Sequence, residues 1–251
     1  MDDIELVSQM SAVTISREYG SGGGEIAARL AKRLGWQLID HEIVERVAGE
    51  MGTSVQEAEA RDERSEGLLE RALNSMVYLN PGLMGDALPV AFLSNEDAYT
   101  RTVSRIVTAA AERGHAVIVG RGSQMLLASR RDVLHVRVIA AMEQRVAYVM
   151  QREGVDAGEA QLRIQMKDHD RARYLEAEYH RKPDDAHLYD VVLNTTVLGL
   201  DSAVEMICLV LERKARLLSV ATGELGPAAG MARYPGQPED FRPPVVRDGE
   251  G

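Results

Sequence analysis

A glycine-rich segment near the N-terminus constrains the fold most strongly. Residues 15–26 read ISREYGSGGGEI, between a short β-branched run (residues 12–16) and a helical pattern of apolar residues that ends at Gly35. Glycines at a strand-to-helix turn let the backbone wrap closely around an anion, and the N–H groups at the helix N-terminus attract a phosphate. The segment therefore predicts a phosphate-binding loop, and a tight turn without a ligand is the alternative.

The loop lacks two side chains of the phosphate-binding (P-loop) motif G-x-x-x-x-G-K-[ST]. Aligned on Gly22, the first glycine of the motif falls at Arg17, the lysine at Gly23 and the hydroxyl at Gly24. That lysine reaches the β- and γ-phosphates of a nucleotide, so an arginine has to supply the charge here. If the loop has P-loop geometry, Gly23→Lys is expected to raise the affinity for ATP.

Arg17 is one candidate for that charge, and a surface ion pair of Arg17 with Glu18 or Glu25 is the alternative. The residues predicted to hold nucleotide phosphate are Arg17, Gly20, Ser21, Gly22, Gly23 and Gly24.

Strand-like and helix-like segments alternate along the rest of the chain. Short apolar runs predict strands at residues 12–16, 37–40, 116–119, 133–139 and 191–193, and helical periodicity predicts helices at about 26–34, 98–113, 142–153 and 201–217. This alternation predicts a parallel sheet with crossover helices. The highly charged segments at about 53–95 and 156–180 are expected to be appendages, which cover a substrate in an enzyme or are otherwise solvated helices.

Composition excludes several classes of protein. The 251 residues are 45% apolar with a net charge of −10, which argues against a general binder of nucleic acid or anionic membranes. No stretch is apolar enough for a membrane span, and the acidic N-terminus is unlike a signal peptide, so a cytoplasmic protein is expected. The single cysteine, Cys208, falls on an apolar helical stripe and is expected to be a core residue rather than a nucleophile. The histidines form no Cys/His cluster, so no structural metal site is expected.

The chain changes character near its C-terminus. Residues 226–251 hold five of the eight prolines and show no apolar periodicity, which predicts a flexible tail behind a single domain spanning residues 1–225. The tail is expected to be solubilising, with a partner-binding arm as the alternative.

Residues 15–35, ISREYGSGGGEIAARLAKRLG, together with three later segments, resemble the cytidylate kinase-like family of P-loop proteins, relatives of the nucleoside monophosphate kinases. Asp40 and Arg46 match the D-x5-R motif of bacterial cytidylate kinases, and Gly120 and Arg121 match the start of their Gly-Arg-Asp motif. KDHDRAR at 167–173 resembles their arginine-rich lid. The segment that reads the cytosine edge in those enzymes has no recognisable counterpart at 53–95.

The resemblance implies an α/β three-layer P-loop NTPase fold with a short parallel sheet. The segment at about 53–95 would be a helical acceptor-side insert, and the segment at about 156–180 a helical lid. The implied roles are catalysis for Asp170, Arg171 and Arg173, and acceptor binding for Asp40, Arg46 and Arg121. Asp40 would serve equally as a helix N-cap, and the lid arginines as part of a solvated helix.

The implied function is ATP-dependent phosphoryl transfer to a small phosphorylated acceptor, such as the nucleoside monophosphate CMP. ATP would be the donor, with Mg²⁺ held mainly by the nucleotide phosphates rather than by a dedicated protein site. Small nucleotides are the expected partners, with no nucleic acid and no membrane. A non-catalytic nucleotide- or phosphate-binding regulatory protein, or a kinase for another small metabolite, is the alternative.

Overall fold

The computed structural model describes residues 6–40 and 96–227 of the chain. Its centre is a five-stranded sheet in the order β2-β3-β1-β4-β5, in which all four neighbouring pairs are parallel. The strands are β1 (Ala12–Arg17), β2 (Gln37–Ile39), β3 (Ala116–Val119), β4 (Val133–Ile139) and β5 (Val191–Asn194). Each lies within one residue of its predicted bounds, because short apolar runs bounded by polar residues and glycines mark buried parallel strands clearly.

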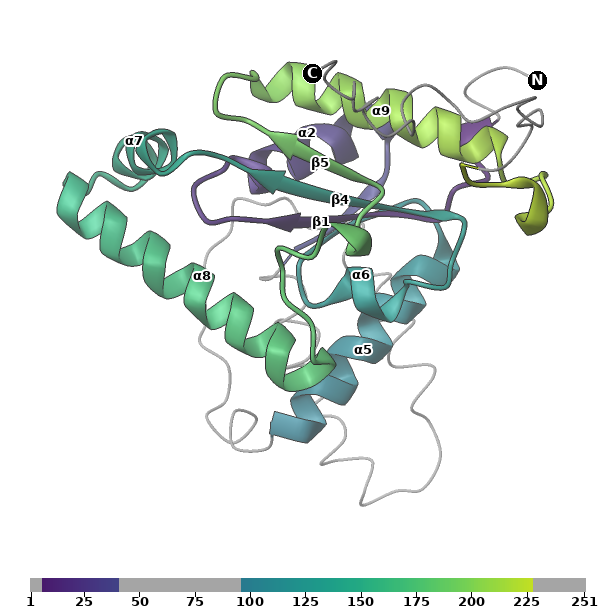
Figure 1. Cartoon of the computed structure of the whole chain (residues 1–251), viewed down its shortest axis with the longest axis horizontal. Helices are drawn as coiled ribbons and strands as arrows, with labels where there is room; N and C mark the ends of the chain where they lie inside the picture. The colour runs from purple at the N-terminus through teal and green to yellow at the C-terminus, as the bar shows by residue number, and fades with distance from the viewer. Residues whose placement is uncertain (1–5, 41–95, 228–251) are drawn as a thin grey trace, which may run out of the picture.

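Helices and short 3₁₀ turns connect and follow the strands (Figure 1). They are α2 (Gly23–Leu34), α5 (Glu96–Arg113), α6 (Ser123–Leu126), α7 (Met142–Glu153), α8 (Ala157–Tyr179), η3 (Ala186–Leu188), α9 (Leu200–Arg216) and η4 (Thr222–Glu224). The predicted helices are confirmed, and α2 ends as expected at Gly35, whose φ of 67° closes the helix in the left-handed conformation. Helix α6 was not predicted, because four residues are too few to show a helical period.

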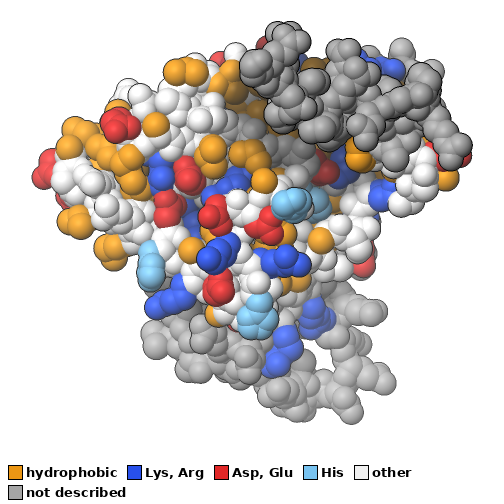
Figure 2. Space-filling view, in the orientation of Figure 1, with side chains coloured by type: hydrophobic (Ala, Val, Ile, Leu, Met, Phe, Trp, Pro, Cys, Tyr) orange, Lys and Arg blue, Asp and Glu red, His pale blue; other side chains and the backbone are white. Residues whose placement is uncertain are grey.

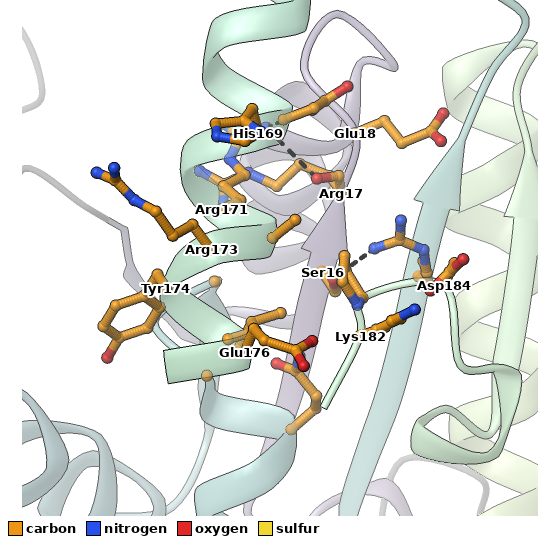
Figure 3. Close-up of a pocket in the computed structure, with 18 of the residues that line it drawn as sticks. Ser16, Arg17, Glu18, His169, Arg171, Arg173, Tyr174, Glu176, Lys182 and Asp184 are labelled. Atoms are coloured by element: carbon orange, nitrogen blue, oxygen red, sulfur yellow. Dashed lines mark hydrogen bonds and ion pairs between the residues drawn. The ribbon is translucent and has the colours of Figure 1, made fainter. Parts of the chain in front are cut away.

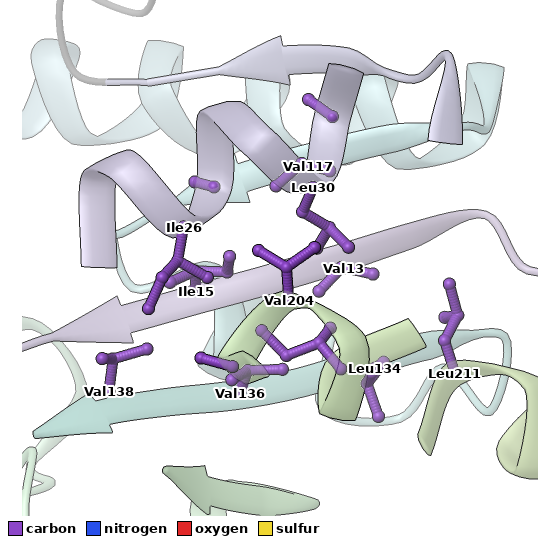
Figure 4. Close-up of a cluster of buried hydrophobic side chains, with 14 of the residues drawn as sticks. Val13, Ile15, Ile26, Leu30, Val117, Leu134, Val136, Val138, Val204 and Leu211 are labelled. Carbon is purple, nitrogen blue, oxygen red and sulfur yellow. The ribbon is translucent and has the colours of Figure 1, made fainter. Parts of the chain in front are cut away.

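Helices cover both faces of the sheet and make the three-layer α/β fold that was predicted. On one face, Ile15 of β1 packs with Ile26 of α2 and Val204 of α9 in the larger core (Figure 4). On the other face, Ile118 of β3 packs with Ile106 of α5. All of these side chains except Val204 are fully buried, and Val204 is 4% exposed, so the sheet forms a rigid base for whatever lies at its edges.

Helices α7 and α8 project beyond the edge at which the strands end (Figure 1). Helix α8 begins at Asp156, whose side chain accepts a hydrogen bond from the N–H of Glu159 at 2.9 Å. Only Ala160, Ile164 and Leu175 of α8 are buried, which explains its high charge. This segment is the predicted lid, and it borders the carboxyl edge of the sheet, where α/β proteins bind ligands.

Several predictions fall outside the described residues. They are the insert at 53–95, Arg46 and all but the first two residues of the tail at 226–251. Cys208 of α9 is half-buried against the larger core, and this burial raises the pKa of its thiol, as expected for a packing residue. None of the helices in the described ranges combines the length and the apolar character that a membrane span requires.

Candidate active site

A cavity of about 720 Å³ opens between the carboxyl ends of the strands and α8 (Figure 3). Charged side chains dominate its lining, and Figure 2 shows basic and acidic groups interspersed across the middle of this face. The cations that line it are Arg17, Arg121, Arg137, Arg171, Arg173 and Lys182. The carboxylates are Glu18, Asp168, Glu176 and Asp184. An excess of guanidinium groups at this edge suits a ligand with phosphate oxygens.

Arg17, the last residue of β1, connects the glycine-rich loop to this cavity. A Cβ at Gly23 would lie 2.6 Å from the Cβ of Arg17, and a Cβ at Gly120 would lie within van der Waals distance of its guanidinium. The side chain therefore starts against the first turn of α2 and ends at the turn after β3. Burial, together with the neighbouring charges of Arg171 and Arg121, lowers the pKa of Arg17 well below the ordinary arginine value. An arginine held among cations in this way favours the arrival of an anion.

The position of Arg17 also explains why the loop has no lysine. The lysine of the P-loop motif would stand at position 23, where any side chain collides with the Cβ of Arg17. Gly23→Lys is therefore expected to disturb the loop rather than simply to raise ATP affinity. The proposed ion pairs of Arg17 with Glu18 or Glu25 are not formed, since Glu18 contacts Arg145, and Glu25 contacts Arg29 and Arg152.

The turn after β3 places Arg121 in the cavity. Gly120, Arg121 and Gly122 all have positive φ, at 73°, 60° and 65°. Arg121 pays the conformational cost of about 1–3 kcal/mol that a non-glycine residue incurs there, a strain that is concentrated at functional sites in proteins. Gly122 is required because a Cβ at this position would lie 2.5 Å from the ring of Tyr179 at the end of α8. Burial lowers the pKa of Arg121, as it does for Arg17.

Asp168 fastens α8 to the glycine-rich loop. Its Oδ1 accepts a hydrogen bond from the backbone N–H of Tyr19 at 2.8 Å, and its Oδ2 pairs with Arg145 of α7. Arg145 is 5% exposed and also donates from Nε to the carbonyl of Tyr19 at 2.7 Å. The loop and α8 are thus joined by two hydrogen bonds and an ion pair.

Arg171 enters the cavity one turn farther along α8. It lies 3.4 Å from Asp168 and donates weakly, at 3.5 Å, to the carbonyl of Arg17, and its guanidinium lies 5.3 Å above the ring of Tyr19. Burial lowers its pKa despite the neighbouring Asp168. Among the predicted lid residues, Arg171 therefore faces the cavity most directly.

The other two predicted lid residues are placed less centrally. Helix α8 is unbroken, and Arg173 is exposed at the cavity margin, with its head directed away from Arg17 in Figure 3. Asp170 is exposed and is not among the described residues that line the cavity. The carboxylates of α8 that do line the cavity are Asp168 and Glu176.

The glycine-rich loop predicted to bind phosphate lies outside the lining of the cavity. Gly20 and Gly22 have φ of 82° and 78°, and the first N–H groups of α2 have no acceptor within the helix or on the side chain of its N-cap. The Ser21 hydroxyl is buried and donates to the carbonyl of Glu18 at 2.9 Å, while Thr195 donates to the Ser21 carbonyl at 2.8 Å. Ser21 thus positions the loop, and Gly24 has open space around it.

Of the two residues of the D-x5-R motif, only Asp40 lies in the described range. It follows β2, is half-buried, and its negative charge acts on Arg17. Arg46 lies beyond the described range. Within that range there is no group of three or more His, Cys, Asp or Glu side chains that could hold a metal ion.

Two cations of the cavity were not predicted from the sequence. Arg137 stands in the middle of β4, inside a run that reads as a buried strand, and Lys182 follows α8 in the segment RKPDD. Arg137 could have been recognised from the sequence, because a charged residue within a largely apolar central strand needs a partner.

Comparison with known proteins agrees with this geometry. Residues 12–197 match the model of the cytidylate kinase-like family. The chain is 26% identical over 199 residues to the cytidylate kinase of Ignicoccus hospitalis, which covers 79% of this chain and 97% of the relative. It is also 33% identical over 95 residues to the cytidylate kinase of Methanopyrus kandleri, 35% of this chain and 49% of that relative.

The fold has a solved counterpart. An uncharacterised protein from Eubacterium ventriosum superposes with a TM-score of 0.60 at 22% identity, covering 81% of this chain and 99% of the other. The parallel five-stranded sheet between two layers of helices is the predicted P-loop fold, and the chain is a phosphotransferase like the nucleoside monophosphate kinases. Since the family match spans most of its length, the chain belongs to the cytidylate kinase-like family.

Proposed function

We propose that this protein transfers a phosphoryl group from ATP to a small phosphorylated acceptor, a nucleoside monophosphate such as CMP. The observation that carries the proposal is the convergence of Arg17, Arg121 and Arg171 on one cavity beside the glycine-rich loop. These three half-buried guanidinium groups come from separate elements and repel one another, and a polyanion bound among them would relieve that repulsion. The two cytidylate kinase relatives support CMP as the first acceptor to test.

The residues have distinct parts in this reaction. The N–H groups at the start of α2 bind the donor phosphates, and Arg121 holds the phosphate of the acceptor. Arg17 lies between these positions and, with Arg171 of the lid, neutralises charge on the phosphoryl group as it passes across. A phosphate acceptor is already a nucleophile at neutral pH, so no protein base is required.

Magnesium fits this arrangement as a companion of the nucleotide. The described carboxylates of the cavity are engaged or dispersed, with Asp168 bonded to Tyr19 and Arg145, so the ion would be held chiefly by the phosphate oxygens of ATP. Bound there, it would neutralise phosphate charge during transfer.

The test is an ADP-release assay with ATP and magnesium, run in parallel with CMP, dCMP, UMP, AMP and GMP. Turnover with one acceptor, lost in Arg121→Ala but kept in Arg33→Ala, is the expected result. Arg33 is a matched control because it is an exposed arginine of α2, outside the cavity. Turnover that survives in Arg121→Ala would refute the assignment of the acceptor site.

The absence of the P-loop lysine and hydroxyl at Gly23 and Gly24 favours a second candidate, a nucleotide-binding protein without transferase activity. This candidate predicts a rise in melting temperature with millimolar ATP and no ADP release with any acceptor. If ATP and GTP both leave the melting temperature unchanged, the phosphate-binding loop is itself refuted.

A further inference from the structure

The cavity contains a buried arginine that the proposed reaction does not use. Arg137 lies in β4 directly beside Ser16 of β1, and its side chain is on the sheet face opposite to the Ile15 core. It is 8% exposed, although it lines the cavity. A guanidinium withdrawn from water to this extent requires a compensating partner, because desolvation of an unpaired ion costs several kcal/mol.

The partners that Arg137 has are neutral. Its Nη1 donates to the hydroxyl of Ser16 at 3.0 Å, and its guanidinium lies 5.6 Å from the ring centre of Tyr189. The Tyr189 hydroxyl is bonded in turn to Ser16 at 3.2 Å and to the carbonyl of Pro183 at 2.9 Å, which fixes the arrangement. Arg137 forms no ion pair with any carboxylate in the described parts of the chain.

The surroundings of Arg137 are built for a polar ligand. Ser16 and Gln124 also line the cavity, and they are 8% and 3% exposed. Lys182 lines the same cavity and adds a second positive charge. The carboxylate of Asp184, two residues farther along the chain, also lines this cavity. A guanidinium carries five N–H donors in a planar fork, so the donors of Arg137 that Ser16 does not engage can bind two oxygens at once.

We propose that Arg137 and Ser16, with Lys182, form a second oxyanion subsite that takes a phosphate or carboxylate group. It shares the cavity with the cluster of Arg17, Arg121 and Arg171, which serves the transferred group and the acceptor phosphate, but it is built on different residues. The source of the group is either the acceptor, which would then carry a second anionic group, or free inorganic phosphate. The assignment of this group to the acceptor rests on the proposed function. The subsite itself does not, because it is inferred from the geometry of Arg137.

The test is calorimetric titration of the full-length protein with inorganic phosphate, without ATP. Arg137→Met is expected to abolish one class of phosphate site, or to weaken it at least tenfold. Arg121→Met is expected to leave that class intact while it weakens the other. Ser16→Ala is expected to weaken the same class about fivefold, the effect of one hydrogen bond of about 1 kcal/mol.

Circular dichroism and melting temperature establish that each variant is folded. Phosphate binding in Arg137→Met with wild-type stoichiometry and affinity would overturn the proposal. If that variant does not fold, unchanged binding in Ser16→Ala would overturn it instead. The titration requires no turnover, so it remains decisive even if no nucleoside monophosphate is phosphorylated.

A repeat at saturating CMP identifies the source of the group. Loss of the Arg137-dependent phosphate site when CMP is bound supports occupation by the acceptor. Retention of that site supports inorganic phosphate as an independent ligand. Both results require that the Arg137-dependent site exists.

Discussion

Asp168 of the lid accepts a hydrogen bond from the backbone N–H of Tyr19 in the glycine-rich loop at 2.8 Å. The same carboxylate pairs with Arg145, which donates to the carbonyl of Tyr19. One lid side chain thereby fixes both the position of α8 and the path of the loop. In the proposed reaction, this attachment would couple the binding of phosphate at the loop to the placement of Arg171, which also pairs with Asp168.

Asp168→Asn is expected to lower the free energy of unfolding by about 1–3 kcal/mol, because it removes one of the two negative partners of the buried Arg145 and leaves only Glu18. Urea denaturation measures the effect. Asp170→Asn is the matched control, since Asp170 lies two residues away on the same helix but is exposed. It is expected to change stability by no more than about 0.5 kcal/mol. Equal effects of the two substitutions would contradict the role assigned to Asp168.

Gly23→Lys is expected to destabilise the protein by about 1–3 kcal/mol, because a side chain there meets the Cβ of Arg17. Gly24→Lys is the control, since nothing lies within 4 Å of a Cβ built at Gly24. Chemical denaturation measures the free energy of unfolding of the two variants. A larger loss in Gly24→Lys than in Gly23→Lys would contradict the steric explanation.

The double variant Arg17→Gly/Gly23→Lys restores the P-loop motif at both positions. The loss of unfolding free energy in the double variant is expected to be smaller than the sum of the losses in the two single variants by at least about 1 kcal/mol. The reason is that Gly at position 17 removes the collision with the side chain at position 23. A double-mutant cycle of unfolding free energies measures this coupling. Additive effects would show that Arg17 and Gly23 do not exclude each other.

His135 makes stability depend on pH near neutrality. Its ring is buried and shares a hydrogen bond with the Thr14 hydroxyl at 2.8 Å, and burial lowers its pKa. In the unfolded chain the imidazole takes up a proton at about pH 6.5, whereas the folded protein resists protonation. The unfolded state therefore binds more protons as the pH falls below that value, and stability decreases.

The unfolding free energy of the wild type is expected to fall between pH 7 and pH 5 more steeply than that of His135→Gln. Urea denaturation at several pH values measures the two slopes. His169→Gln is the control, because His169 is exposed on α8, and its slope is expected to match the wild type. If the unfolding free energy of His135→Gln changes with pH as steeply as that of the wild type, His135 is not the source of the pH dependence.

Much of this fold was predictable, because parallel strands buried on both faces show as apolar runs and α2 ends at a glycine. The path of Arg17 was not, since it depends on how closely the ends of β1, α2 and β3 approach one another. Arg171 and Arg173 are two residues apart on α8 and so point in different directions, but helical spacing could not select Asp168 over Asp170. That choice depends on the loop that α8 meets, which is a tertiary contact.

Arg137 shows the complementary case. Its place inside β4 follows from the sequence, but the neutral partners Ser16 and Tyr189 come from segments more than 50 residues distant. The sequence pattern thus located the strand, while the neutral partners of Arg137 became visible only in three dimensions.

The central claim is that Arg17 supplies the charge of the missing P-loop lysine. The most direct measurement is kcat and KM for Arg17→Met, with Arg33→Met as control, using ATP, magnesium and the acceptor identified by the ADP-release assay. Arg17→Met is expected to lower kcat about 10²- to 10³-fold, since it removes charge stabilisation of the transferring group. Its melting temperature should be unchanged or higher, because a buried cation among cations is removed. A kcat for Arg17→Met within about threefold of the wild type, a difference of less than about 1 kcal/mol in the barrier, would contradict the account.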